Sequence, residues 1–183
     1  RSSDLDRARA GWAIVAAEWL APRDPAPRIV TDAGEMAISG KIDRVDAHEE
    51  HGWAVIDYKT SDRGDPPERA HKRGGRWIDL QLPLYRTLAA PLASRLGLSG
   101  EPALGYFNLP RESSATGVRI ASWSREELAE ADGLARDVAS AVLRGRFEEV
   151  GRPDAGGTMG LLCGTGILEI RGEDGEVGGG DEA

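Results

Sequence analysis

The sequence of 183 residues predicts an α/β fold in which helices flank a mixed central β-sheet. Three observations support this prediction. Short runs rich in β-branched and aromatic residues alternate with turn residues, which is typical of strands. Other segments repeat leucine and valine at three- and four-residue spacing, which indicates amphipathic helices. An apolar content of 40% is enough to build a core, and a chain of this length is the size of one domain.

Three helices and six strands are predicted in this order: helix 3–10; strands 12–19, 28–31, 36–46 and 53–60; helix 76–96; strands 103–109 and 117–123; helix 124–147. Ser3 and Ser124 are suitable N-caps, and Ser124 is followed three residues later by Glu127, as in a capping box. Pro83 lies inside the second helical segment, so we expect either a kink or a late start of that helix.

Two segments are predicted to be irregular. Residues 61–75 lack apolar periodicity and contain two prolines and three glycines, so we expect a mobile basic loop there. After residue 150 the chain is rich in glycine and acidic residues. We therefore expect residues 151–183 to be a disordered tail with at most one weak strand at 163–170, and residues 1–150 to form the folded domain.

The net charge of −8 is unevenly distributed along the chain. Residues 148–183 contain nine acidic and two basic side chains, which leaves a net charge of −1 for residues 1–147. Residues 59–76 contain six basic and three acidic side chains. The overall charge therefore does not exclude a phosphate-bearing partner, and the local charge favours one.

The cysteine content and hydropathy of the chain exclude some kinds of site and segment. Cys163 is the single cysteine, which excludes an internal disulfide and an all-cysteine metal site within this chain. We expect a reducing, cytoplasmic setting. The sequence has no apolar run long enough for a transmembrane helix and no visible secretory signal. Because it begins with Arg1, we expect an upstream portion to exist.

The candidate site lies in the predicted central hairpin, in the segments G-K-I-D-R-V-D and V-I-D-Y-K. Asp57 and Lys59 are two residues apart on a strand, so their side chains should project from one face. A turn centred on Glu50 places Asp43 across from Asp57, with Cβ atoms roughly 5 Å apart. Two carboxylates this close repel each other unless they share a proton or bind a cation. With the Lys59 ammonium beside them, they indicate a metal site that acts on an anionic substrate.

Three motifs in the chain resemble those of the PD-(D/E)xK nuclease superfamily: Gly40-x-Ile42-Asp43-Arg44-Val45-Asp46, Ile56-Asp57-Tyr58-Lys59-Thr60 and Gln81-Leu82-Pro83-Leu84-Tyr85. D-x-K alone occurs by chance in many chains, but three motifs in family order and at family spacing are specific in combination. The resemblance covers about residues 11–150 and is greatest to RecB/AddB-type nuclease domains of helicase–nuclease complexes. It implies a restriction-endonuclease-like core.

The resemblance implies a metal-dependent mechanism for the hairpin residues. Asp43, Asp57 and the backbone carbonyl of Tyr58 would hold Mg²⁺ or Mn²⁺, since hard cations take oxygen ligands. A water with a lowered pKa could then attack a phosphodiester. Lys59 would orient or help to deprotonate that water and offset the charge that develops at phosphorus.

Two further groups of residues are assigned to the site. Gln81 and Tyr85 are four residues apart on one helix face, and the resemblance implies that they contact DNA or support the lysine. The alternative is a core aromatic and a solvated glutamine. The basic loop would contact the nucleic-acid backbone without reading its sequence. Its nucleic-acid-binding residues are predicted to be Arg63, Arg69, Lys72, Arg73 and Arg76.

Other polar residues are expected to have structural roles. Arg44 lies on the strand face opposite the predicted metal site, so we interpret it as an ion-pair partner. Glu18 could approach the metal site or serve as a surface or capping residue. His48, His51 and His71 have no metal-ligand spacing, and we expect them in solvated turns or loops.

The chain departs from the RecB/AddB pattern at two places. Members of that type carry a histidine on an upstream helix, whereas residues 1–47 contain no histidine. That histidine either precedes Arg1 or has been lost. Members of the AddB type often hold an iron–sulfur cluster with four cysteines, and with Cys163 alone no cluster is expected.

The resemblance therefore implies a Mg²⁺-dependent deoxyribonuclease within a recombination or double-strand-break repair machine, supplied with single-stranded DNA by a helicase. The alternative is a catalytically inactive DNA-binding or scaffolding module with the same fold. A glycosidase with a carboxylate pair is a third class, but it gives no reason for Lys59 beside Asp57.

Overall fold

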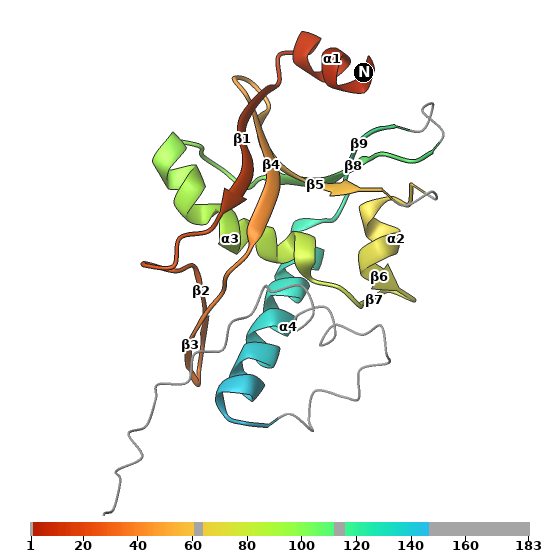
Figure 1. Ribbon diagram of the computed structural model, residues 1–183. Helices are drawn as coiled ribbons and strands as arrows, with labels where there is room; N and C mark the ends of the chain where they lie inside the picture. Colours follow the sequence, from red (N-terminus) through yellow and green to blue (C-terminus); the bar gives the residue numbers. More distant parts are fainter. Residues whose placement is uncertain (1, 61–63, 112–115, 147–183) are drawn as a thin grey trace, which may run out of the picture.

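The computed structural model describes residues 2–60, 64–111 and 116–146, and a mixed five-stranded sheet forms its centre (Figure 1). The strand order is β1-β4-β5-β8-β9. The bounds are β1 (Ala13–Leu20), β4 (Lys41–His48), β5 (Gly52–Lys59), β8 (Ala103–Asn108) and β9 (Gly117–Ile120). β5 and β8 run parallel, and the other neighbouring pairs are antiparallel. The predicted α/β class with a mixed central sheet is confirmed.

Helices cover both faces of this sheet. α3 (Gln81–Leu96) and α4 (Arg125–Leu143) lie on one side and α1 (Ser2–Arg9) lies on the other (Figure 1). The larger core contains Val55 of β5 together with residues of α3 and α4, whereas Ile56 belongs to a smaller cluster with Phe107. β5 is therefore buried on both faces, which explains its nearly continuous apolar run.

A buried group of charges holds α1 against the sheet. Arg44 donates hydrogen bonds to Asp46 at 2.6 and 2.9 Å and to Asp4 of α1 at 2.6 Å. Arg7 of α1 also donates to Asp46, at 2.5 Å. Although burial opposes its charge, hydrogen bonds to Asp46 and Asp4 hold the pKa of Arg44 above its ordinary value. The prediction that Arg44 is a structural ion-pair partner is confirmed.

The central hairpin has the predicted register. Arg44 pairs with Ile56 and His48 pairs with Gly52, so the turn centres on Glu50. The same register, continued by one residue, places Asp43 opposite Asp57 at the open end of the hairpin.

The predicted strand at 36–46 is wrong, because two strands occupy this segment. β3 (Gly34–Ala37) pairs with β2 (Arg28–Thr31) in a separate hairpin, and β4 begins only at Lys41. Residues 38–40 connect the two sheets, with the Ile38 N–H donating to the Pro27 carbonyl and the Gly40 carbonyl accepting from Ala21.

The prediction of a single irregular loop at 61–75 is also wrong for its described part. α2 (Pro67–His71) is followed by a short hairpin of β6 (Lys72–Arg73) and β7 (Arg76–Trp77). The hairpin turn consists of Gly74 and Gly75, whose φ angles are 57° and 78°. A two-residue turn with positive φ at both positions strongly favours glycine, so the Gly-Gly pair explains the hairpin.

The two long helices begin where local signals place them. α3 begins at Gln81 rather than residue 76, so Pro83 lies in the first turn, where its missing N–H is not required. The predicted late start is confirmed. Ser124 and Glu127 form the predicted capping box at the start of α4. α4 ends at Leu143, whereas Phe147, the tail at 151–183 and the possible strand at 163–170 lie outside the described residues. A helix that spans a membrane must reach a certain length and apolarity. Within the described residues, no helix is long and apolar enough to cross a membrane.

Candidate active site

The candidate site lies at the C-terminal end of β5, on the sheet face that α3 covers. Asp57 is 4% exposed, and its Oδ2 lies 2.7 Å from Nζ of Lys59. Lys59 is about one-third exposed, so the ammonium lies between the buried carboxylate and solvent. The two side chains project from one face as predicted.

Asp43 contributes a second carboxylate from the neighbouring strand. Its Oδ2 accepts a hydrogen bond of 3.0 Å from the backbone N–H of Tyr58. Burial raises the pKa of Asp57, the Lys59 ammonium opposes this increase, and the negative charge of Asp43 adds to it. The negative charge of Asp43 therefore opposes the ionisation of Asp57.

α3 contributes the predicted glutamine and tyrosine from its first two turns. Gln81 accepts from Lys59 Nζ at 3.1 Å and donates from Nε2 to Asp57 Oδ1 at 3.3 Å and to the Tyr85 hydroxyl at 3.0 Å. The Tyr85 hydroxyl donates to Asp57 Oδ1 at 3.2 Å. Burial, followed by the charges of Asp57 and Asp43, raises the pKa of Tyr85, so this hydroxyl remains a donor. Gln81 is therefore not merely solvated.

The donor set fits a hard divalent cation. Asp57 Oδ2 is buried and accepts no hydrogen bond, and its close contact is the ion pair with Lys59. Asp43 and Asp57 supply carboxylate oxygens, and Mg²⁺ is commonly held by one or two carboxylates while it keeps several waters. In the described part of the chain, no group of three or more His, Cys, Asp or Glu side chains is arranged to hold a metal. Glu18 instead pairs with Lys41 at the surface.

Three of the predicted nucleic-acid-binding residues are exposed: Arg69, Arg73 and Arg76. Arg69 lies on α2, whereas Arg73 and Arg76 face each other across the β6–β7 hairpin. Arg63 lies outside the described residues.

Lys72, the remaining predicted nucleic-acid-binding residue, is directed toward α4. Its ammonium lies 2.8 Å from Glu127 and 3.8 Å from Glu130, and its side chain is 14% exposed. It also lies 4.8 Å from the centroid of the Trp77 ring. These contacts join the β6–β7 hairpin to α4 and leave Lys72 less accessible to a phosphate than its arginine neighbours.

The expectation that His71 is solvated is wrong. Its side chain is fully buried at the end of α2, where its ring packs edge-on against Trp123. Nε2 lies 2.6 Å from the hydroxyl of Tyr106 on β8. The parallel register of β5 and β8 places Tyr106 beside Asp57. The strand at residues 103–109 was predicted, but its parallel pairing with β5 was not, so the alternation of side chains along that strand was the only signal for Tyr106 in the sequence.

The other two histidines lie near the turn of the central hairpin. His48 Nε2 is 2.9 Å from the Ala10 carbonyl, and its Nδ1 accepts the backbone N–H groups of Glu50 and His51. The His48 and His51 rings lie 4.3 Å apart between centroids. Neither residue reaches the candidate site.

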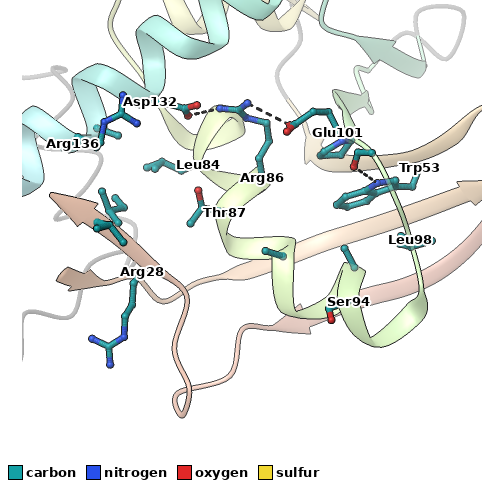
Figure 2. Close-up of a pocket in the computed structure, with 17 residues that line it drawn as sticks. Arg28, Trp53, Leu84, Arg86, Thr87, Ser94, Leu98, Glu101, Asp132 and Arg136 are labelled. Carbon is teal, nitrogen blue, oxygen red and sulfur yellow. Dashed lines mark hydrogen bonds and ion pairs between the residues drawn. The ribbon is translucent and has the colours of Figure 1, made fainter.

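A separate pocket of about 620 Å³ lies between β2, α3 and α4 (Figure 2). Within it, Arg86 pairs with Glu101 at 3.4 Å and with Asp132. None of the predicted catalytic or metal-binding residues lines this pocket, so it is distinct from the candidate site.

The fold and the site together define an α/β protein with a carboxylate–lysine site at the end of a central strand, the arrangement of a restriction-endonuclease-like core. The chain belongs to the PD-(D/E)XK nuclease superfamily, whose family model matches residues 1–165. Members of this superfamily are generally phosphodiester hydrolases that use divalent metal ions. A comparison with curated proteins found no significant match.

Proposed function

We propose that this chain is a Mg²⁺- or Mn²⁺-dependent deoxyribonuclease that hydrolyses phosphodiester bonds. The observation that carries this proposal is the cluster of Asp43, Asp57 and Lys59 at the open end of the central hairpin, in which Gln81 bonds to both Asp57 and Lys59. Two carboxylates beside one ammonium suit a reaction in which the carboxylates bind a divalent cation and the ammonium interacts with a phosphate group.

Each side chain has a specific role in the proposed mechanism. Asp43, Asp57 and the Tyr58 carbonyl would hold the divalent cation, which lowers the pKa of a water and polarises a phosphoryl oxygen. Lys59 orients the attacking water and stabilises the negative charge that develops at phosphorus. Gln81 fixes Lys59 and Asp57 relative to each other, because its amide bonds to both side chains.

The exposed arginines of α2 and the β6–β7 hairpin support an anionic substrate. Arg73 and Arg76 are directly opposite each other in the β6–β7 hairpin, and like charges in that position destabilise a strand pair. A phosphate bound between or beside them would relieve this repulsion. With Arg69 they would hold the DNA backbone without reading its sequence.

We further propose that the chain is the nuclease module of a RecB/AddB-type helicase–nuclease complex and acts on single-stranded DNA. The order of its three motifs supports this assignment. If it is right, cleavage should be faster on single strands than on a duplex of the same sequence, and a cognate helicase should restore cleavage of the duplex.

Substitution of two site residues tests the catalytic proposal. Asp57→Ala and Lys59→Ala should each reduce cleavage of single-stranded DNA with Mg²⁺ by at least about 100-fold while the far-UV circular dichroism is retained. Lys41→Ala is a matched control, because it removes the same charge from an exposed ion pair with Glu18. Unchanged cleavage by either site variant would refute the assignment.

A second candidate function is a DNA-binding or scaffolding module without catalysis. The observation that favours it is that the described residues supply two acidic ligands and no third His, Cys, Asp or Glu near them. Calorimetric titration with Mn²⁺ separates the two functions. The nuclease requires binding that Asp57→Ala abolishes, whereas the module predicts no binding by either protein.

A further inference from the structure

A fully buried histidine lies behind the candidate catalytic lysine, and the mechanism proposed above does not use it. His71 ends α2, and its ring packs against Tyr106 and Trp123 with centroid distances of 5.8 and 5.3 Å. A buried polar ring is costly unless its nitrogens have hydrogen-bond partners. Both nitrogens of His71 have partners, and these partners connect it to the site.

The hydrogen bonds of His71 define which nitrogen carries the proton. Nδ1 lies 2.9 Å from the backbone carbonyl of Asp79, which can only accept, so Nδ1 is the donor. In a neutral ring Nε2 is then an acceptor, and the Tyr106 hydroxyl donates to it at 2.6 Å. Burial lowers the pKa of His71, which favours this neutral form. The histidine therefore fixes the direction of the Tyr106 hydroxyl and the position of its ring.

The Tyr106 ring forms one side of the space that Lys59 occupies. Lys59 Nζ lies 5.0 Å from the ring centroid, within the range of a cation–π interaction. On another side, the ammonium donates to Gln81 Oε1 at 3.1 Å. The ring and the amide thus restrain the ammonium in addition to its ion pair with Asp57.

Both of these restraints end on the same residue, Asp79. The Asp79 carbonyl accepts from His71, which holds Tyr106, and the Asp79 side chain accepts the backbone N–H of Gln81 at 2.7 Å. The contacts therefore form a continuous series around Lys59, from Tyr106 through His71, Asp79 and Gln81. A change at His71 should move the Tyr106 ring, whereas the hydrogen bonds of Gln81 to Asp79 and Lys59 should remain.

We propose that His71 is a positioning residue for Lys59 and acts through the Tyr106 ring. Its ring contacts Tyr106, Trp123 and the Asp79 carbonyl, none of which is a predicted metal ligand. The importance of this positioning for catalysis rests on the nuclease function proposed above, whereas the positioning itself does not.

The lysine content of the chain makes the proposal directly measurable. The sequence contains three lysines, Lys41, Lys59 and Lys72, so a protein labelled with ¹³C at the lysine ε-carbons gives three NMR signals. Lysine-to-arginine variants assign them. The Tyr106 ring shifts the Lys59 signal by its ring current, and Tyr106→Leu defines the signal without the ring.

His71→Leu should move the Lys59 signal toward its position in Tyr106→Leu while the Lys41 signal stays unchanged. Tyr106→Phe keeps the ring but removes its bond to His71, so it should move the Lys59 signal in the same direction. If His71→Leu does not fold, this second variant provides the same readout. His71→Gln retains a donor and an acceptor, and it should restore the wild-type signal at least in part.

The control is Trp123→Phe, which changes a ring that packs on His71 and Trp77 rather than on Lys59. In cleavage assays, His71→Leu and Tyr106→Phe should lower kcat about 10- to 100-fold with little change in KM, whereas Trp123→Phe should retain kcat within about twofold.

A Lys59 signal that does not respond to His71→Leu or to Tyr106→Phe in folded protein would overturn the positioning role. The NMR measurement requires neither metal nor DNA. An inactive wild-type protein would therefore count against the nuclease function alone, and the Lys59 signal would still decide the role of His71.

Discussion

The ionised carboxylate of Asp57 lowers the stability of the fold, although the proposed reaction requires it. Burial raises its pKa, so the folded protein holds the proton of this carboxyl more tightly than the unfolded chain does. The stabilisation from this group is complete below the unfolded pKa and is lost as pH rises through the folded pKa. At neutral pH the protein therefore bears the cost of a buried negative charge that the proposed reaction requires.

Asp57→Asn should consequently be more stable than the wild type at pH 7, because the amide cannot ionise. Calorimetry in metal-free buffer should show a melting temperature a few degrees higher for the variant, with the difference shrinking as pH falls toward the ordinary carboxyl range. Added Mn²⁺ should then raise the melting temperature of the wild type only. A variant less stable than the wild type at pH 7 would contradict the expectation.

Tyr85 acts on the same carboxylate through a single hydroxyl. Tyr85→Phe removes one of the two hydrogen bonds to Asp57 Oδ1, from Tyr85 and Gln81, and leaves the aromatic packing in place. We expect cleavage to slow by about 10- to 100-fold, which is typical when a group that orients a metal ligand is removed. Ser140→Ala is the control, because it deletes a hydroxyl that bonds to Asp32 on another part of the molecule. Equal activity of both variants would show that the Tyr85 hydroxyl does not contribute to cleavage.

At the scale of elements, the predictions from sequence were accurate where local chemistry decides the structure. Ser124 and Glu127 predicted the start of α4 because a capping box involves only four consecutive residues. His71 was misjudged because its burial depends on Trp123 and Tyr106, which are distant in sequence. The Gly74–Gly75 turn is a local signal that was available in the sequence but was read as loop.

The attachment of α1 to the sheet depends on a buried ion pair. Asp46 is fully buried and bonds to both Arg44 and Arg7, so Asp46→Ala leaves the Arg7 guanidinium without its carboxylate and the Arg44 guanidinium with Asp4 alone. We expect a loss of about 3–5 kcal/mol in the free energy of unfolding, measured by urea denaturation. Removal of the exposed Lys41 from its pair with Glu18 should cost less than about 1 kcal/mol. Similar losses for both variants would show that burial does not determine the energy of the Asp46 cluster.

At the scale of the whole molecule, the sheet order was not contained in the sequence pattern. The hairpin that contains Asp43 and Asp57 could be derived from alternation and one turn, and its register is as predicted. The parallel pairing of β5 with β8 joins segments separated by α2 and α3, and no local rule specifies it. The position of Tyr106 beside Asp57 and Lys59 was therefore visible only in the structure.

The distribution of charge over the molecule leads to the final prediction. The chain has a net charge of −8, so binding of DNA must depend on local clusters such as Arg69, Arg73 and Arg76. Each phosphate neutralised on a single strand contributes about −0.7 to the slope of log K against log salt. Replacing all three arginines by alanine should therefore make this slope less negative by about 2, as fluorescence anisotropy with labelled single-stranded DNA can measure.

A matched variant distinguishes this local effect from a change in net charge. Replacement of Arg28, Arg95 and Arg136 by alanine also lowers the net charge by three, but these exposed residues lie on β2, α3 and α4. The screened charge of a distant surface acts only within about 10 Å at ordinary ionic strength, so this variant should keep the wild-type slope. Equal slopes for the two triple variants would mean that the α2–β7 segment does not hold the phosphates, and that net charge governs the salt dependence instead.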